Sequence, residues 1–180
     1  MKKLKFNSLE EFTIQYNLDK LNNKTLVISD IDGVIIDKML SLRALLGLVP
    51  KKNLKFLEEI LKTQCAVWFF TNRLSCYKHF PIRRQLSASV QKITNKSLGI
   101  YSNCADFLKG HLEKYIIIFN ARKPKAKSQL VVAKGIRNYD KVIYFGAQDL
   151  PFYFSDEELV DKLDKQIDLS KVTFIDIRPK

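Results

Sequence analysis

The sequence predicts an α/β fold, a three-layer α/β/α sandwich around a mainly parallel, Rossmann-like central sheet. Five short apolar runs of strand type begin near residues 26, 66, 115, 142 and 173, and segments with helical character separate them. Strands that alternate with helices form parallel sheets through right-handed crossovers. The 180 residues are 46% apolar and 28% charged, without a linker-like stretch or a repeat. This composition predicts one soluble domain over residues 1–180.

A helix is predicted near the start of the chain. Ser8 and Glu11 have the spacing of a capping box, and Leu9, Phe12 and Tyr16 then fall on one face. We expect this helix to cover one edge or the bottom of the sheet. A turn at residues 22–24 leads into the first apolar strand.

The stretch 25–37, TLVISDIDGVIID, ends that strand on two carboxylates. Asp30 and Asp32 lie where open α/β sheets place their ligand crevices. If the backbone stays extended, Ile31 points the opposite way and both carboxylates project into one small volume. Two like charges this close need a cation or a shared proton, which suits Mg²⁺ and a phosphorylated substrate. Gly33 allows a tight bend. The alternative is an ordinary turn after a strand.

The segment 38–52 is more apolar than a surface loop requires. It predicts either a helix packed on the sheet or a small lid over the site. Leu54, Leu57, Ile60 and Leu61 then indicate a helix at three-to-four spacing.

The second buried strand, 65–70, ends in Thr71, Asn72 and Arg73. Thr71 and Asn72 supply hydrogen-bond donors, and the planar guanidinium of Arg73 matches phosphate oxygens. The alternative is that these three residues cap the start of a helix. A basic helical segment follows at 76–96, with one apolar face formed by Ile82, Leu86, Val90 and Ile93.

The formal net charge of +12 is unevenly distributed. No Asp or Glu occurs between Leu61 and Ala105, where seven Lys and Arg residues lie. Such a field attracts nucleic acid, other polyanions or anionic membrane surfaces, and it speeds the encounter with phosphorylated substrates. Candidates for a substrate patch near the mouth of the site are Tyr77, Phe80, Arg83 and Arg84. The alternative is a solvated basic face.

Two further strands carry the remaining candidate residues. Strand 115–119 is followed by Lys123 and Pro124, and the alternative for this KPKAK segment is a solvated loop. Strand 142–145 is followed by Gly146, Ala147, Gln148 and Asp149. A helix at 155–166 and a last strand at 172–176 complete the predicted elements.

Cys65, Cys76 and Cys104 are odd in number and widely spaced. They indicate neither a disulfide framework nor a zinc site, which fits a reducing, cytoplasmic compartment. The sequence predicts no secretory signal and no transmembrane span.

Three of these patterns resemble, in order, the motifs of the haloacid dehalogenase (HAD) superfamily: DxDGV after a strand, a strand ending in Thr71, and a strand followed by Lys123. The resemblance implies a HAD-like phosphatase with little or no cap domain. In that family the residue matching Asp30 is the nucleophile, and the residue matching Asp32 is the general acid and base.

The resemblance also implies the remaining roles. Thr71 would bind the transferring phosphoryl group and Lys123 would neutralise it, while Gly33, Asn72 and Arg73 are assigned to substrate binding. Mg²⁺ would be held by Asp30, the backbone carbonyl of Asp32 and a later acidic residue. The fourth motif departs from the family pattern, because Ala147 stands where an Asp is usual. Asp149 is the nearest carboxylate, with Asp156 and Glu157 as further candidates.

We therefore expect Mg²⁺-dependent hydrolysis of phosphomonoesters through an aspartyl-phosphate intermediate on Asp30. The open site and the basic charge favour a large or polyanionic phosphorylated substrate. The alternative is a catalytically weak HAD-like module that binds a phosphorylated partner, which the atypical Ala147 favours.

Overall fold

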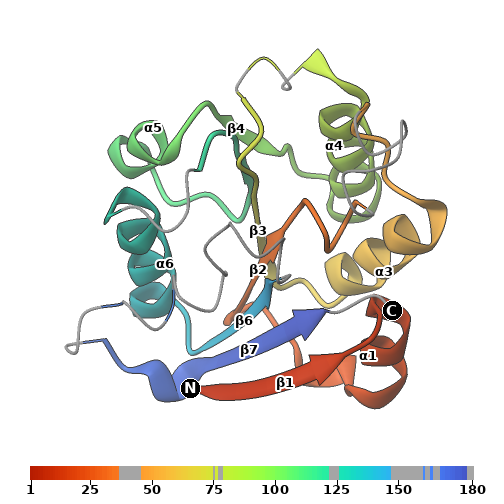
Figure 1. Cartoon of the computed structure of the whole chain (residues 1–180), viewed down its shortest axis with the longest axis vertical. Coiled ribbons are helices and arrows are strands. Elements are labelled where there is room, and N and C mark those ends of the chain that lie inside the picture. The colour runs from red at the N-terminus through yellow and green to blue at the C-terminus, as the bar shows by residue number, and fades with distance from the viewer. Residues whose placement is uncertain are drawn as a thin grey trace.

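The structure is a computed structural model that describes residues 1–36, 46–74, 76, 79–121, 126–146, 160, 163 and 167–177. It is an α/β protein with a seven-stranded, all-parallel sheet and helices on both faces (Figure 1). The strands are β1 (Lys2–Phe6), β2 (Thr25–Asp30), β3 (Ala66–Phe70), β4 (Gly99–Tyr101), β5 (Tyr115–Ile118), β6 (Lys141–Gly146) and β7 (Val172–Ile177). The helices are α1 (Leu9–Gln15), α3 (Lys51–Lys62), α4 (Pro81–Thr94), α5 (Cys104–Lys109) and α6 (Ala126–Asn138), with 3₁₀ turns at Leu18–Lys20 and Leu169–Lys171.

The strand order across the sheet is β1-β7-β6-β2-β3-β5-β4. Strand β2 lies in the interior, with β6 on one side and β3 on the other. All six of its residues are buried, as are all five of β3. The predicted three-layer, Rossmann-like fold with five buried strands is thus confirmed.

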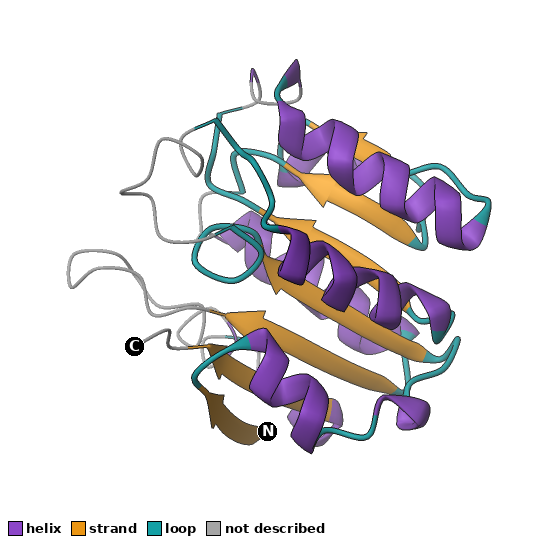
Figure 2. Cartoon of the chain, turned by 90° about the vertical axis from the view of Figure 1, so that its right-hand side faces the viewer, coloured by secondary structure: helices purple, strands orange, loops and turns teal. Residues whose placement is uncertain are grey.

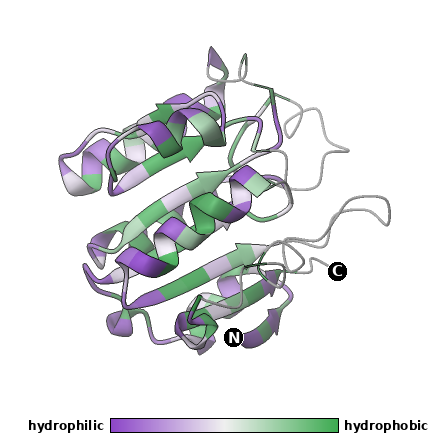
Figure 3. Ribbon diagram, turned by 90° about the vertical axis from the view of Figure 1, so that its left-hand side faces the viewer, coloured by the Kyte–Doolittle hydropathy of each residue, from purple (hydrophilic) through white to green (hydrophobic). Residues whose placement is uncertain are grey.

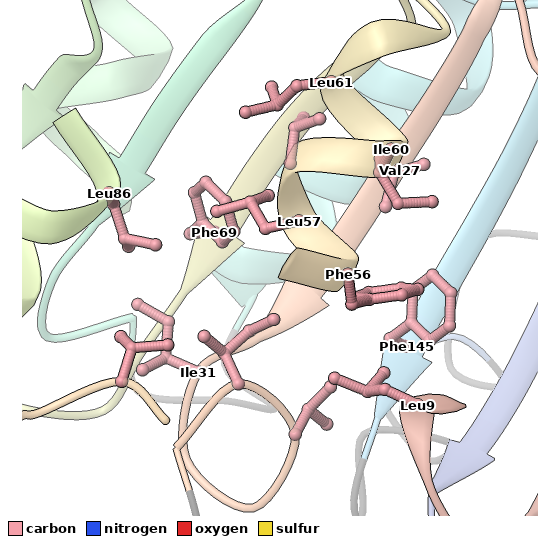
Figure 4. Close-up of a cluster of buried hydrophobic side chains, with 14 of the residues drawn as sticks. Leu9, Val27, Ile31, Phe56, Leu57, Ile60, Leu61, Phe69, Leu86 and Phe145 are labelled. Atoms are coloured by element: carbon pink, nitrogen blue, oxygen red, sulfur yellow. The ribbon is translucent and has the colours of Figure 1, made fainter. Parts of the chain in front are cut away.

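One apolar layer lies between the sheet and the helices α1, α3 and α4. The side chains of Val27 and Phe69 from the sheet meet Leu57 and Leu86 from the helices in this layer (Figure 4). Figure 2 shows the three helices alongside the strands on this face. The face of α4 that the sequence predicts is buried at Ile82, Leu86 and Val90.

The second apolar layer lies between the opposite face of the sheet and the helices α5 and α6. It includes Leu26 and Ile28 of β2, Trp68 of β3 and Phe107 of α5. Figure 3 shows apolar colouring along the strands, and the helices carry apolar and polar residues together. The chain therefore buries both faces of its central strands, as parallel sheets require.

Two strands were not predicted from the sequence, and both lie at an edge of the sheet. Among the described residues, β1 pairs only with β7 and is mostly exposed, and β4 pairs only with β5. Helix α1 begins as predicted, with the Ser8 hydroxyl accepting a hydrogen bond from the backbone N–H of Glu11.

Of the predicted lid segment 38–52, residues 38–45 lie outside the described part of the chain. Residues 46–50 form a turn and a short loop, and α3 begins at Lys51. Most of the helix predicted at 155–166 also lies outside the described residues. Within the described part of the chain, no helix combines the length and apolar character needed to cross a membrane.

Candidate functional site

The candidate site lies at the carboxyl ends of β2 and β3, which are neighbours in the sheet. Asp30 is the last residue of β2, pairs in register with Phe70 of β3, and is 3% exposed. Its Oδ1 accepts a hydrogen bond of 3.0 Å from the backbone N–H of Ile31. The same N–H donates to the carbonyl of Phe70 at 2.9 Å, so the pairing of the two strands continues one residue beyond β2.

A tight turn follows Asp30. Gly33 has a φ of +83°, a conformation that side chains with a Cβ resist, which is the bend expected from the sequence. The backbone N–H of Gly33 donates to the carbonyl of Ile36, and those of Ile35 and Ile36 donate to the carbonyl of Ile31. The buried side chains of Ile31, Ile35 and Ile36 anchor the turn to the apolar layer under α3. This turn presents Asp32 at the edge of the sheet.

Both carboxylate oxygens of Asp32 have partners on the segment after β3. The hydroxyl of Thr71 donates to Asp32 Oδ2 at 2.7 Å, and Arg73 Nε donates to Asp32 Oδ1 at 2.8 Å. The side chains of Arg73 and Asp32 are only 3% and 13% exposed. The first two predicted motifs therefore meet in one buried, charge-assisted contact.

The segment 71–73 is in turn held by the loop that follows β5. The backbone N–H of Thr71 donates to the carbonyl of Ile118, and those of Asn120 and Ala121 donate to the carbonyls of Arg73 and Thr71. Asn120, two residues after β5, has a φ of +46°, a left-handed conformation that asparagine adopts more readily than most residues. The carboxyl ends of three neighbouring strands are thus joined at the candidate site.

The structure brings together six of the predicted site residues, namely Asp30, Asp32, Gly33, Thr71, Asn72 and Arg73. The side chain of Asn72 is exposed beside the buried Thr71 and Arg73. Lys123, Ala147 and Asp149 lie outside the described residues. The next helix whose bounds the structure describes is α4, which begins at Pro81 with Phe80 as its cap residue.

Asp176 is a further carboxylate at this edge to which sequence reasoning gave no role. It lies near the end of β7, is 4% exposed and pairs in register with Gly146 of β6. Asp176 is two residues from Phe174 on β7, so both lie on the same face of the sheet. Asp30 lies on this face as well. Strands two apart in a sheet lie about 10 Å from each other. An apolar strand ending in Asp, as in VTFID, is the signal shared with β2.

The donors at the site are hard oxygens of the kind that Mg²⁺ prefers. The Asp30 carboxylate and the backbone carbonyl of Asp32 fit such an ion. Among the described residues, however, no group of three or more His, Cys, Asp or Glu side chains is close enough to hold a metal ion. The set is completed if Asp149, Asp156 or Glu157, all of which lie outside the described residues, supplies a third ligand.

A cleft of about 760 Å³ opens next to the site, between the starts of α5 and α6. Its lining includes Asn103, Asp106 and Lys127 as well as Asn120 and Ala121. Since Asn120 and Ala121 are hydrogen-bonded to the segment 71–73, the cleft and the site share a wall.

No protein-family model matches this chain, and neither the curated proteins nor the solved structures contain a match. The similarity to the HAD superfamily therefore rests on the residues themselves.

Proposed function

We propose that the protein is a Mg²⁺-dependent phosphatase that hydrolyses phosphomonoesters through a covalent intermediate on Asp30. The observation that carries this proposal is the contact of Asp32 with Thr71 and Arg73 immediately beside Asp30. It brings to one sheet edge the residues that match the nucleophile, the general acid and base, and the hydroxyl donor of the HAD superfamily that the sequence resembles. Arg73 adds a guanidinium to this set.

The reaction has two displacements. A carboxylate oxygen of Asp30 attacks phosphorus, the bond from phosphorus to the leaving oxygen breaks, and that oxygen takes a proton from Asp32. Water then attacks the aspartyl phosphate and gives a proton to Asp32. The bond between phosphorus and Asp30 breaks, and inorganic phosphate and the free carboxylate result.

Thr71 couples substrate binding to the release of Asp32. Its hydroxyl has one proton, which it donates to Asp32 Oδ2 at 2.7 Å. When that proton is donated to a phosphoryl oxygen instead, Oδ2 becomes available to the leaving group. Arg73 Nε keeps the other oxygen in place meanwhile.

Mg²⁺, when bound, would neutralise charge on the phosphoryl oxygens. Asp30, the backbone carbonyl of Asp32 and Asp149 are the residues we assign to it. Lys123 is assigned to neutralise the same charge.

A second candidate function is a binding module for a phosphorylated partner. One observation favours it: both oxygens of Asp32 are already engaged, and the paired side chains are almost fully buried. A module that only binds needs no exchange of these contacts. It would keep phosphate in the site without turnover.

The test is hydrolysis of p-nitrophenyl phosphate by the purified chain with and without Mg²⁺. We expect Mg²⁺-dependent release that Asp30→Asn abolishes, and that Thr71→Val lowers by about 10²-fold to 10³-fold, as for loss of a donor to a transition-state oxyanion. Asp140→Asn is the matched control, since Asp140 is an exposed carboxylate paired with Lys24. Release that persists in Asp30→Asn would remove Asp30 as the nucleophile.

Orthovanadate binding separates the two candidate functions. The enzyme should bind orthovanadate more tightly in the presence of Mg²⁺. Absence of hydrolysis, together with anion binding that is indifferent to Mg²⁺, would favour the binding module.

A further inference from the structure

Basic residues lie at the starts of the two long helices on one face of the sheet. Lys51 and Lys52 are the first two residues of α3, and Arg83 and Arg84 lie in the first turn of α4. Neither helix has an acidic residue in its first turn. We call these four residues the basic rim. Cations at a helix N-terminus oppose the helix dipole, so helix stability does not account for them.

The basic rim lies at the same edge of the sheet as the candidate site. Helix α3 connects β2 to β3 and α4 connects β3 to β4, all of which are parallel strands. Both helices therefore run antiparallel to the strands and begin at the carboxyl edge (Figure 2). The backbone N–H of Val49, just before α3, donates to Gln85 Oε1 of α4 at 2.9 Å, so the two starts are adjacent.

The helix starts that carry the basic rim also pack against the site. Asn53, in the first turn of α3, donates from Nδ2 to the carbonyl of Ile35 in the turn after Asp30, at 2.8 Å. A Cβ placed on Gly47 would lie 3.3 Å from Ile82 Cβ and 3.7 Å from Arg73 Nη1. Gly47 thus lies between the start of α4 and the Arg73 guanidinium that pairs with Asp32.

The opposite ends of the same helices differ in their charge pairing. There, Lys62 pairs with Glu59 at 2.8 Å and Lys92 pairs with Glu58 at 3.1 Å. Within the part of the chain that the structure describes, Lys51, Lys52 and Arg84 are exposed and form no such ion pair. Lys51, Lys52 and Arg84 therefore add positive charge beside the site that no ion pair among the described residues offsets.

We infer that the basic rim binds the backbone phosphates of a single-stranded polynucleotide whose terminal phosphate enters the site at Asp30. The part that concerns the terminal phosphate rests on the proposed function, whereas backbone binding does not. A flexible strand can insert its end and lay the following phosphates over the rim. A flat anionic membrane fits less well, because Asp30 is only 3% exposed.

The test compares Arg83→Gln/Arg84→Gln with Lys92→Gln/Lys96→Gln. Each double variant removes two positive charges from the same helix region, the first at the carboxyl edge and the second at the far end. The probe is a fluorescein-labelled oligothymidine of about 12 nucleotides, phosphorylated at the 5′ end in one series and at the 3′ end in another. Affinity is measured by anisotropy over a range of salt concentrations.

We expect the rim variant to lower the slope of log affinity against log salt by about 1.4, which is about 0.7 for each lost phosphate contact. The far-end control should keep the slope of the unmodified chain. We also expect the rim variant to reduce kcat/KM for the phosphorylated oligonucleotide about tenfold more than for p-nitrophenyl phosphate. Equal slopes in the two double variants would overturn the inference.

The remaining outcomes separate the inference from the proposed function. If the unmodified chain hydrolyses neither substrate but the rim variant still loses slope, the phosphatase fails and backbone binding stands. If the unmodified chain hydrolyses p-nitrophenyl phosphate but the two double variants have equal slopes, the phosphatase stands and backbone binding fails. Displacement of the oligonucleotide by phosphatidylserine vesicles that bind more tightly would assign the rim to a membrane and overturn the inference.

Discussion

The carboxylate of Asp32 holds together segments that are about forty residues apart in the sequence. Its two oxygens accept from Thr71 and Arg73, and the pair with Arg73 is almost completely buried. Burying a charged group costs free energy. The folded protein is therefore strongly destabilised when one partner of such a buried pair is removed alone. The arrangement fixes the position of Asp32 next to Asp30.

A double-mutant cycle with Asp32→Asn and Arg73→Gln measures this contact. Arg73→Gln should reduce the free energy of unfolding by about 3–5 kcal/mol, because it leaves a buried carboxylate without its cation. The double variant should lose less than the sum of the two single variants. The control cycle is Lys24→Gln with Asp140→Asn, an exposed pair at 3.6 Å that should contribute about 0–1 kcal/mol. Equal coupling energies in urea denaturation would show that the buried pair does not hold the site.

Cys65 gives a pH-dependent prediction in the core. It is fully buried, and the loss of hydration raises the pKa of its thiol from 9.0 to about 11. In the unfolded chain the thiol ionises with a pKa of about 9, whereas in the folded chain it stays neutral up to about pH 11. Below pH 9 the thiol is neutral in both states, so the free energy of unfolding should not change through this group. It should then fall as the pH rises to 11, by about 2–3 kcal/mol.

Cys65→Ala is the comparison for this prediction, because tyrosines such as Tyr101 also titrate at high pH. Unfolding by urea at pH 8, 9, 10 and 11 should show a steeper decline for the unmodified chain than for the variant. Identical declines would mean that water reaches the thiol in the folded protein. Exposed Cys76 serves as an internal control for thiol labelling.

Among the strands, the sequence predicted the interior ones and missed the two at the edges of the sheet. The strands β2, β3, β5, β6 and β7 are continuous apolar runs, because each is covered on both faces. Strand β1 reads KKLKF, and only Phe6 is buried. An edge strand has one neighbour and can be largely polar, so its hydrophobic pattern is weak. Strand β4 has three half-buried residues, too few for a pattern.

Gly135 shows how closely α6 approaches the sheet. A Cβ at this position would lie 2.5 Å from Leu26 Cδ2 and 3.1 Å from Cζ3 of Trp68, both of which are fully buried. Gly135→Ala should therefore destabilise the protein by about 1–3 kcal/mol by overpacking. Helix propensity alone predicts the opposite, a gain of about 1 kcal/mol.

A second substitution tests this steric explanation. Leu26→Val shortens the side chain that meets the added methyl group, so Leu26→Val/Gly135→Ala should be more stable than the sum of the single effects predicts. Thermal unfolding of the four chains gives the comparison. Strict additivity, or a stabilised Gly135→Ala variant, would mean that α6 moves away from the sheet at no cost.

For the whole molecule, the strand order explains which parts of the site could be predicted from the sequence. The patterns after β2 and β3 were recognised separately, and the adjacency of these strands brings Asp30, Asp32, Thr71 and Arg73 together. The pairing of Arg73 with Asp32 was not predicted, since a motif does not show which of two anions a guanidinium contacts. Asp176 was missed for a similar reason, because its place on the face of Asp30 depends on register through β6.

The same strand order predicts how the sheet opens. Strands β2, β3 and β6 are hydrogen-bonded on both sides, whereas, in the part of the chain that the structure describes, β1 pairs only with β7 and β4 only with β5. Segments with few neighbours open at lower free energy than the core. In hydrogen–deuterium exchange, amides of β1 and β4 should therefore exchange first and those of β2 and β3 last, with α1 and α4 as helical references. Lys2, Lys3 and Lys5 on β1 oppose pairing with another chain. Protection of β1 equal to that of β2 would contradict this reasoning, and dilution of the sample would then show whether a second copy covers the edge.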